Sequence, residues 1–483
     1  MDHLLVIDEG TTSTRAMLFR ADGQCVASEA TALTQSYPRP GWVEHDAAEI
    51  WRETLHVASA VVGQAGGPGR IAAIGITNQR ETVVFWDKTT GEPLAPAIVW
   101  QDRRTADRCR ALAEAGHEQM VQRRTGLLLD PYFSASKIGW AMEHWPQLRD
   151  EGERLAIGTV DSWLVWKLTG RHVTDATNAS RTALMRLDGG WDYELIDLFG
   201  VPRAALPEIV DCAGEIGRTS LFGGAIPVTG MAGDQQAAAI GQACLSPGET
   251  KATFGTGAFI LTHTGETAPT STNRLLSTVA WQLGGRRVYA LEGSVFVAGS
   301  LLQWLRDSLG LLTDVADSAA LAAGIPDTGG VHLVPALSGL GAPWWRPDAR
   351  AALTGMSFAT GKAQIVRAAL EAMSYQAHDL KRAFAADGAD WASLRIDGGM
   401  VANDWLAQDL ADMLAVPVER PRFAETTALG AAMLAGIGCG LFADLHEASA
   451  MRGAVERFEA TLDHDSRKRR LGGWRHAVAG VIA

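Results

Sequence analysis

Two short stretches, one near the start of the chain and one in its middle, have the same pattern. Residues 5–19 (LVIDEGTTSTRAMLF) and residues 250–262 (TKATFGTGAFILT) both predict a strand, a tight turn containing Gly and Thr, and a second strand. Small hairpin turns commonly contain Gly, so the two turns alone are weak evidence of a repeat. Each hairpin opens a half of similar size, however, and this predicts a duplicated fold with a cleft between the halves.

The chain has 483 residues, which is too many for one ordinary hydrophobic core and predicts two domains, with three as the alternative. Short apolar runs typical of strands, such as residues 71–78, alternate with helical runs such as residues 365–386. This alternation predicts the α/β class with central sheets. The turn-rich stretch 245–250 (LSPGET) is the best candidate boundary, so we expect domains at residues 1–247 and 248–483.

The bulk composition argues against several classes of protein. A net charge of −12 with no strongly basic stretch to offset it argues against a nucleic-acid partner, and the short run RKRR at 467–470 predicts a solvated surface. The five cysteines are scattered without a CxxC pair, which indicates a reduced, cytoplasmic setting rather than a zinc site or a disulfide framework. The first residues predict a strand rather than a signal peptide, and no apolar run is long enough to span a membrane.

The turn of the first hairpin, DEGTTSTR (8–15), combines a flexible glycine with hydroxyl side chains and a cation. Backbone N–H groups in such a turn can cradle phosphate oxygens, Arg15 adds a fixed positive charge, and Asp8 can face a hydrated Mg²⁺. A polar hairpin in which Asp8 bonds the turn is an equally good interpretation. The chain has no GxxxxGK[ST] sequence, so a P-loop is excluded as the nucleotide-binding device.

Polar residues follow a second apolar strand in GITNQRET (75–82). Arg80 donates hydrogen bonds in a planar fork and Glu81 accepts them, so the pair can bind two neighbouring hydroxyls of a polyol. The alternative is a surface ion pair, which is the commoner fate of adjacent opposite charges. Trp100 and Tyr132 can supply an apolar face and a phenol, although aromatic residues usually belong to the core.

Residues 231–241 (MAGDQQAAAIG) place a carboxylate, Asp234, at the start of an apolar helix. A helix N-cap is the ordinary interpretation of such an Asp. In the second half, TFGTGAF (253–259) repeats the chemistry of the first turn. Gly398 and Gly399, between a strand and a helix, can let a flat ligand approach the backbone, or can simply make a strand-to-helix turn.

Taken together, these stretches resemble the FGGY family of carbohydrate kinases over nearly the whole chain and in the family's order. The resembling stretches are DEGTTSTRA, YPRPGWVEHD, GITNQRET, IVWQDRRT, TGLLLDPYFSASK, GTVDSWLVWKLTG, TDATNASRT, AGDQQAA, TFGTGAF, GLGAPWW, DGGMVAND and ETTALGAAMLAG. Combined, they are highly specific for the family. Within it, GITNQRET with DPYFS points to glycerol as the substrate.

The resemblance implies an actin-like ATPase fold of two duplicated, ribonuclease H-like α/β domains, with substrate and nucleotide between them. It implies that Mg²⁺ and ATP are used to phosphorylate glycerol to sn-glycerol 3-phosphate. The positions that match the family's glycerol contacts are Arg80, Glu81, Tyr132, Asp234 and Gln235, with Trp100 and Phe259 flanking the carbons and Asp234 as the catalytic base. The positions that match its phosphate and nucleotide contacts are Thr11, Thr12, Ser13, Arg15, Thr256, Gly299, Gln303, Gly399 and Asn403.

Two other functions stay open. The same chemistry can serve another small polyol or ketose, such as erythritol or xylulose. An actin-like ATP-binding protein without kinase activity is the rival from another class, although such a protein needs no polyol clamp. A homo-oligomer, either a dimer or a tetramer, is compatible with the sequence, which does not fix it.

The chain also departs from the family at three places. Glu9 replaces the usual Gln and is expected to add a negative charge beside the phosphate turn. Residues 219–230 are shorter than in some members and lack the Arg of a sugar-bisphosphate regulatory site, so feedback control of that type is not expected. Residues 341–351 (GAPWWRPDARA) differ in detail from the usual pattern.

Overall fold

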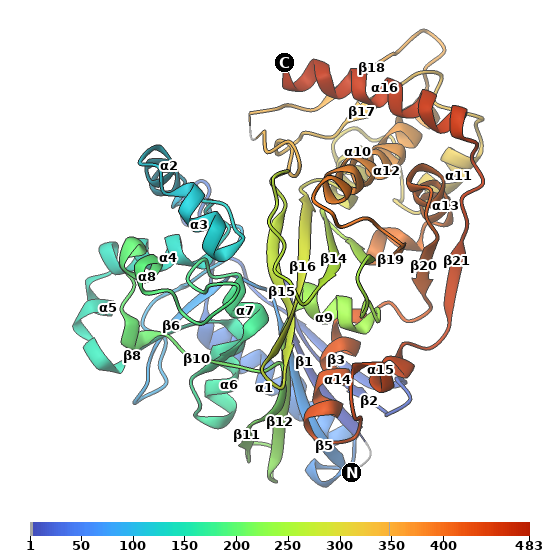
Figure 1. Cartoon of the computed structure of the whole chain (residues 1–483). Helices are drawn as coiled ribbons and strands as arrows, with labels where there is room; N and C mark the ends of the chain where they lie inside the picture. Colours follow the sequence, from blue (N-terminus) through green and yellow to red (C-terminus); the bar gives the residue numbers. More distant parts are fainter. Residues whose placement is uncertain (1–2, 347) are drawn as a thin grey trace.

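The computed structural model describes residues 3–346 and 348–483, which form two α/β halves (Figure 1). The N-terminal half is built on a six-stranded sheet with the order β11-β12-β5-β1-β2-β3. In it β1 is antiparallel to β2 and parallel to β5, which is parallel to β12. The strands are β1 (His3–Glu9), β2 (Ser13–Phe19), β3 (Cys25–Ala32), β5 (Ile71–Asn78), β11 (Ala213–Thr219) and β12 (Ile226–Gly233).

The C-terminal half repeats this pattern in a seven-stranded sheet with the order β15-β16-β14-β13-β19-β20-β21. Here β13 is antiparallel to β14 and parallel to β19, which is parallel to β20. The predicted duplication is therefore confirmed for the core of the two sheets, to which the C-terminal half adds β15 as an extra edge strand. The strands are β13 (Glu249–Phe254), β14 (Ala258–Gly265), β15 (Leu276–Leu283), β16 (Arg286–Val295), β19 (Ser393–Asp397), β20 (Val418–Pro421) and β21 (Val455–Phe458).

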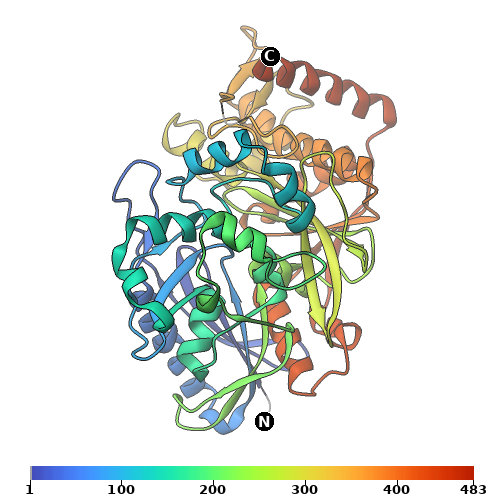
Figure 2. The same cartoon turned by 60° about the vertical axis from the view of Figure 1, so that its left-hand side comes forward.

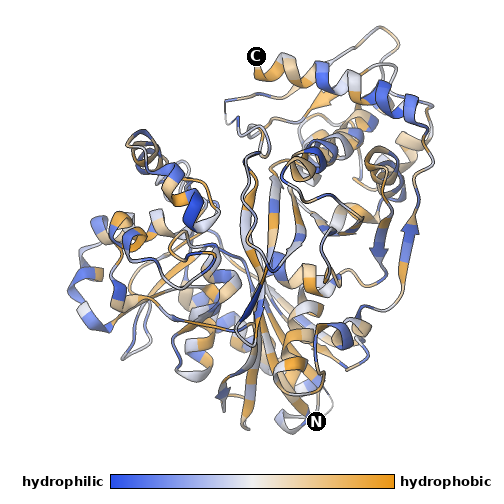
Figure 3. Cartoon of the chain, in the orientation of Figure 1, coloured by the Kyte–Doolittle hydropathy of each residue, from blue (hydrophilic) through white to orange (hydrophobic). Residues whose placement is uncertain are grey.

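Both sheets are covered by helices on their faces, as their continuous apolar strands require. In β1, Leu5 and Ile7 pack with α1 (Ala47–Gln64) and α6 (Val160–Thr169), whereas Leu4 and Val6 pack with α14 (Thr426–Gly438). The C-terminal sheet carries α12 (Lys362–Ala386) and α13 (Asp404–Leu414). Hydrophobic residues accordingly concentrate on the central strands of both sheets (Figure 3).

Two helices from different parts of the chain cross between the sheets. Helix α9 (Asp234–Gly241) follows β12 and α14 follows β20, so the two occupy equivalent places in the repeat. Their backbones touch at two glycines: a Cβ added to Gly241 would lie 2.0 Å from the Thr426 carbonyl oxygen, and one added to Gly430 would lie 1.8 Å from that of Ala237. Only glycine permits so close a crossing. Helix α14, although late in the sequence, thus packs on the N-terminal sheet, and the domain limits at 247/248 stay a prediction.

The hairpin of β15 and β16 forms one edge of the C-terminal sheet and also lies against the N-terminal half (Figures 1 and 2). The backbone N–H of Ser277 donates to the Gly126 carbonyl (2.9 Å), and the Tyr289 hydroxyl donates to the Leu187 carbonyl (3.1 Å). Helix α7 (Ala176–Ser180) contacts β15 in the same region. Residues of this hairpin therefore reach the junction between the halves.

The remaining elements extend the two halves. A four-stranded sheet has the order β4-β7-β6-β8, and two pairs are β9 with β10 and β17 with β18. These strands are β4 (Glu44–His45), β6 (Val83–Asp87), β7 (Ala97–Ile98), β8 (Leu155–Thr159), β9 (Val173–Asp175), β10 (Glu208–Val210), β17 (His332–Val334) and β18 (Ala352–Thr354). The other α-helices are α2 (Ala106–Glu114), α3 (Glu118–Thr125), α4 (Ser134–His144), α5 (Pro146–Asp150), α8 (Tyr193–Phe199), α10 (Gly299–Asp307), α11 (Asp317–Ala323), α15 (Leu445–Ala448) and α16 (His464–Ile482).

Three expectations from composition can be compared with the structure. Among the described residues, no helix is both long enough and apolar enough to cross a membrane. All five cysteines are free thiols: Cys25, Cys109, Cys212, Cys244 and Cys439. The basic run of 467–470 is only partly a solvated surface, because Arg470 pairs with Asp409 (2.7 Å) and Arg467 donates to the Asp412 carbonyl (2.6 Å).

Candidate active site

The polar residues of the site lie where parallel strands end. Strands β1, β5 and β12 run in the same direction, so their carboxyl ends meet at one edge of the N-terminal sheet. Ligands of open α/β sheets bind at such an edge. Asp8 lies near the end of β1, Arg80 follows β5 and Asp234 follows β12. The fold therefore brings together three residues that are far apart in the sequence.

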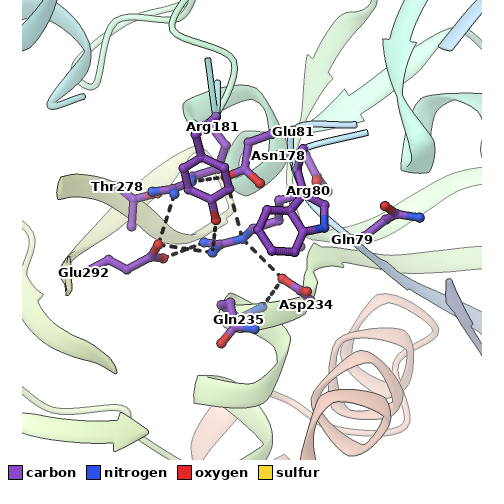
Figure 4. Close-up of polar contacts among 12 residues, drawn as sticks. Gln79, Arg80, Glu81, Asn178, Arg181, Asp234, Gln235, Thr278 and Glu292 are labelled. Carbon is purple, nitrogen blue, oxygen red and sulfur yellow. Dashed lines mark hydrogen bonds and ion pairs between the residues drawn. The ribbon is translucent and has the colours of Figure 1, made fainter. Parts of the chain in front are cut away.

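Arg80 is the centre of this cluster, and its side chain is only 2% exposed. Its Nε lies 3.2 Å from Oδ1 of Asp234, and its Nη1 donates to the side chain of Gln236 (3.2 Å). Its Nη2 lies 3.5 Å from the hydroxyl of Tyr132. The alternative of a surface ion pair is thus excluded for Arg80, a buried group that contacts both Asp234 (Figure 4) and the phenol of Tyr132.

Glu81 is held in place by a partner that the sequence did not single out. Its Oε1 accepts a hydrogen bond from Nε of Arg181 (2.6 Å), and its backbone has a positive φ of 64°, a conformation that is costly for a residue with a side chain. Burial raises the pKa of the Glu81 carboxyl, while Arg181 and Arg80 oppose that rise. A strained backbone and an ion pair with Arg181 therefore hold the Glu81 side chain in the cluster.

Asp234 is the first residue of α9 rather than its N-cap, which is Gly233. Its Oδ1 accepts from the backbone N–H of Gln235 (2.7 Å) and lies beside Arg80, while about a third of its side chain (32%) stays exposed. Desolvation raises the pKa of the Asp234 carboxyl, and the cations Arg80 and Lys251 act against this rise. The ordinary capping interpretation is therefore wrong, and the carboxylate has an accessible side.

Gln235 is fixed by a buried ammonium group from the C-terminal half. Nζ of Lys251 donates to Oε1 of Gln235 and to Oγ1 of Thr253 (2.8 Å for the latter). Burial lowers the pKa of Lys251, although Asp397 and Asp234 favour its charged form. The hydrogen bond from Lys251 fixes the orientation of the Gln235 amide, whose nitrogen can donate to a ligand.

Three aromatic side chains gather beside the polar cluster. The ring of Trp100 makes edge contacts with Tyr132 (centroids 5.6 Å apart) and with Phe259 (6.3 Å). Phe259 lies on β14 and the other two belong to the N-terminal half. The indole N–H of Trp100 donates to Oγ1 of Thr11 (2.9 Å), which ties the aromatic group to the first phosphate turn. The structure thus brings together the seven residues predicted to contact glycerol.

The two predicted phosphate turns are both well formed. In the first, the N–H of Gly10 donates to the Ser13 carbonyl (3.0 Å), and Arg15 pairs with Glu425 at the start of α14 (2.5 Å). The hydroxyls of this turn are only partly buried, and the side chain of Thr12 is exposed.

In the second turn, the N–H groups of Ala298 and Ser300 both donate to the Thr256 carbonyl (2.9 and 3.1 Å). Gly299, at the start of α10, donates to the Gly255 carbonyl at 2.8 Å.

The remaining residues predicted to contact the nucleotide differ in their burial and in their hydrogen bonds. Gly398 has a φ of 93°, and a Cβ there would lie 2.5 Å from the Phe254 carbonyl oxygen, so the diglycine loop lies against the end of β13. Gly399 and Gln303 are exposed beside it. Asn403 is the N-cap of α13, where its side chain accepts from Leu406 N–H (3.0 Å) and donates to Ser318 (3.2 Å). The capping role of Asn403 is thus shown, and its nucleotide role stays a prediction.

Asp8 and Glu9 have different surroundings although they are adjacent. Burial raises the pKa of Asp8 to about 7, with Arg15 opposing and the nearby carboxylates of Glu425 and Asp234 adding to the rise. Glu9 points toward α1 instead, where Thr54 donates to its Oε2 (3.0 Å), and burial raises its pKa to about 8. This shift and the contact with α1 favour a protonated Glu9 near pH 7, so little extra negative charge is expected beside the turn.

The described residues contain no group of three His, Cys, Asp or Glu side chains that could hold a metal ion by themselves. The mutual repulsion of Asp8 and Asp234 is nevertheless a feature that a cation would relieve. Mg²⁺ is commonly held by one or two carboxylates together with waters and substrate phosphates. The residues present fit that type of site.

Four polar residues of the cluster were missed by sequence reasoning: Arg181, Gln236, Lys251 and Glu292. Glu292 carried the clearest signal, since it is a lone acid in the apolar run VYALEGSVFV (288–297). A charged residue in a buried strand requires a partner. Lys251 in ETKATF gave the same signal. Neither stretch of sequence, however, identifies the partner of Glu292 or of Lys251.

Comparison with known proteins agrees with this architecture. Residues 3–241 match the N-terminal domain, and residues 250–439 the C-terminal domain, of the FGGY family of carbohydrate kinases. The chain is 53% identical to a glycerol kinase of Alcanivorax borkumensis, over 100% of this chain and 98% of that protein. It is also 53% identical to a glycerol kinase of Methylobacterium nodulans, over 99% and 98% of the two chains.

Among solved structures, Plasmodium falciparum glycerol kinase with ADP superposes with a TM-score of 0.94 at 35% identity, covering 100% of this chain and 99% of that one. A xylulose kinase from Lactobacillus acidophilus shares the fold (TM-score 0.88, 21% identity, 99% and 97% coverage). The duplicated sheets and the polar cluster thus define a kinase of the actin-like ATPase fold. The chain belongs to the FGGY family of carbohydrate kinases.

Proposed function

We propose that this chain transfers the γ-phosphoryl group of ATP to a terminal hydroxyl of glycerol, giving sn-glycerol 3-phosphate and ADP. The observation that carries the proposal is the cluster in which Arg80, Tyr132 and Asp234 converge beside the rings of Trp100 and Phe259. Such a slot offers hydrogen bonds on one side and apolar contact on the other. The glycerol kinases that resemble this chain support the same conclusion.

The chemistry asks the protein mainly for positioning and charge compensation. The carboxylate of Asp234 takes the proton of the attacking hydroxyl while the oxygen forms a bond to the γ-phosphorus and the bond to the ADP oxygen breaks. Arg80 and Glu81 bind the other hydroxyls, and the amide nitrogen of Gln235 donates to one of them. Tyr132 keeps its proton, because burial raises its pKa far above the ordinary value for a phenol.

The nucleotide is assigned to the two turns. The hydroxyls and N–H groups of Thr11, Thr12 and Ser13, with Arg15, serve the phosphates, and Thr256, Gly299, Gln303, Gly399 and Asn403 serve the rest of ATP. Asp8 would hold hydrated Mg²⁺, which when bound neutralises phosphate charge.

The free thiols fit a cytoplasmic setting.

Measured release of ADP over a panel of acceptors tests the proposal. Glycerol should give the highest kcat/KM among glycerol, dihydroxyacetone, erythritol, xylulose and ribulose, with dihydroxyacetone second because it keeps three carbons and both terminal hydroxyls. A longer acceptor must bury an unpaired hydroxyl or clash, which costs about 1–3 kcal/mol, or roughly 5- to 150-fold. A higher kcat/KM for erythritol or a pentulose would overturn glycerol as the acceptor. ATP turnover that needs no polyol would overturn the kinase assignment itself.

A further inference from the structure

One acid of the C-terminal half enters the polar cluster and pairs with two arginines of the N-terminal half. Glu292 lies on β16 and is fully buried, at 0% exposure. Its Oε2 accepts from Nη1 of Arg80 (2.6 Å), and its Oε1 accepts from Nη2 of Arg80 (3.1 Å) and from Nη2 of Arg181 (3.0 Å). Burial alone would raise the pKa of Glu292, but Arg181 and Arg80 outweigh it and lower the pKa to about 2. Glu292 is therefore ionised at any working pH.

The two hydrogen bonds that Glu292 accepts from Arg80 fix the orientation of the Arg80 side chain. A guanidinium group is a rigid planar fork, so a carboxylate that binds both of its Nη atoms fixes its plane and rotation. With that side occupied, the Nε edge of Arg80 faces Asp234 at 3.2 Å and the free part of Nη2 faces Tyr132 (Figure 4). Glu292 thus presents Arg80 to the acceptor site without any need to touch an acceptor.

The same carboxylate acts on Glu81 through Arg181. Arg181 is 0% exposed, and it donates through Nε to Glu81 (2.6 Å) and through Nη2 to Glu292 (3.0 Å). Glu81, whose backbone is strained, is therefore held by a chain of ion pairs that begins at Glu292. One side chain of the second half orients both members of the polyol clamp.

Glu292 can do this because its strand is attached to the other half. The β15–β16 hairpin is hydrogen-bonded to the N-terminal half near Gly126 and Leu187. We propose that Glu292 is a positioning residue for the acceptor site: it fixes Arg80 and Arg181 so that the clamp is complete only when the two halves are joined. This inference rests on the proposed function, in that the clamp is taken to bind a polyol.

Substituting Arg80 by Ala cannot test this, because it would leave Glu292 and Glu81 with only one arginine in a buried site. Glu292→Asp is a sharper test. It keeps the negative charge but shortens the side chain by one methylene, so we expect that the carboxylate no longer binds both arginines. We expect the KM for glycerol to rise about 10-fold or more, the loss typical of a charged hydrogen bond, while the KM for ATP changes less than about 2-fold. Arg181→Lys, which keeps the charge without the fork, should give the same split and serves as the second variant.

Glu371→Asp is the matched control. Glu371 is another buried acid (3% exposed) that contacts two arginines, Arg367 (2.9 Å) and Arg470 (3.3 Å), but it lies on α12 away from the clamp. Shortening it should lower the Tm without changing either KM. The inference is overturned if Glu292→Asp and Arg181→Lys leave the glycerol KM no higher than Glu371→Asp does, or if they raise both KM values equally.

The wild-type acceptor panel separates this result from the proposed function. If the wild type prefers another polyol, glycerol is the wrong acceptor, and the variant-to-wild-type ratio of KM is measured with that preferred polyol. A selective rise in that ratio still supports Glu292 as a positioning residue, and an unchanged ratio overturns it.

Discussion

Asp234 combines two properties that a general base for an alcohol needs. Its carboxylate keeps an exposed side, and it is paired with Arg80 on the other side. The pairing stabilises the charged form, whereas desolvation raises the pKa of the Asp234 carboxyl and strengthens it as a base. These two properties support the proposal that Asp234 orients a hydroxyl and accepts its proton.

Replacing Asp234 by Asn keeps the size and the contact with Arg80 but removes the ability to accept a proton. We expect kcat to fall by about 10²- to 10⁴-fold, the usual contribution of a general base. The Tm and the KM for ATP serve as controls and should stay near the wild-type values. A variant that keeps near wild-type kcat would show that Asp234 is not the base.

Glu9 predicts a pH dependence of stability. Its pKa rises from the ordinary 4.5 to about 8 in the folded protein, so the folded state holds a proton that the unfolded state loses between these values. The free energy of unfolding should therefore decrease as pH rises from about 4.5 to 8, by up to roughly 1.4 kcal/mol per pH unit from this group. Below that window the group contributes no penalty.

Glu9→Gln tests this argument, because the amide has the shape of the protonated acid and cannot ionise. We expect little change in Tm at pH 5 and a clear increase at pH 8. Glu114→Gln, at an exposed acid on α2, should change the Tm at neither pH. Equal Tm differences between Glu9→Gln and wild type at both pH values would contradict a protonated Glu9.

At this scale the sequence predicted the residues of the clamp but not what holds them. Arg80, Glu81 and Asp234 follow apolar strands, where local patterns alone left a surface ion pair and an N-cap as alternatives, and the resemblance to the family singled them out. Their partners Arg181, Lys251 and Glu292 come from other elements, up to 212 residues away for Arg80 and Glu292. Single-residue signals say that a buried charge needs a partner, and only the tertiary structure says which one.

Among the elements, the crossing of α9 and α14 is a close backbone contact between distant segments. It places α9, from Ala237 to Gly241, against a helix of the last quarter of the chain. Both glycines at the crossing face backbone carbonyls rather than flexible side chains. A methyl group at either position would therefore overlap a backbone carbonyl.

Gly430→Ala should lower the free energy of unfolding by about 3 kcal/mol or more, the upper range for overpacking a core. The matched control is Gly472→Ala on α16, where a Cβ would meet nothing within 4 Å. There we expect a gain of about 0.5–1 kcal/mol, because alanine favours the helix. Unfolding in urea measures both. Equal effects of the two substitutions would mean that the crossing is not tight in solution.

The elements themselves were largely predictable. The hairpins of β1–β2 and β13–β14 follow from their apolar runs and Gly-Thr turns, and α12 begins only three residues before the predicted 365–386. The docking of α14 was not predictable, since ETTALGAAMLAG is apolar on all sides and fits any buried place. The β15–β16 hairpin likewise carries no local sign that it lies against the other half.

At the scale of the whole molecule, the connection between β11 and β12 predicts how activity responds to a sugar bisphosphate. Residues 219–230 contain no Arg, and the adjacent Arg218 is already paired with Glu215 (3.0 Å). A sugar bisphosphate would find no free cation in this segment. We expect activity to be unchanged by millimolar fructose 1,6-bisphosphate in the ADP-release assay. Saturable inhibition that disappears when 219–230 is altered would contradict this expectation.

The glycine crossing also limits how the two halves can move. Where two backbones touch without side chains between them, sliding would force atoms into overlap, whereas a small rotation about the contact changes the distances at the contact itself very little. We therefore expect Gly241 and Gly430 to form a pivot, and Asp234 lies seven residues from Gly241 along α9, about 10 Å at 1.5 Å per residue. Points on the outer ends of the sheets have a much longer lever arm. We expect opening and closing of the enzyme to displace the nucleotide turns more than the base, so that the proton acceptor stays nearly still while the donor is brought to it.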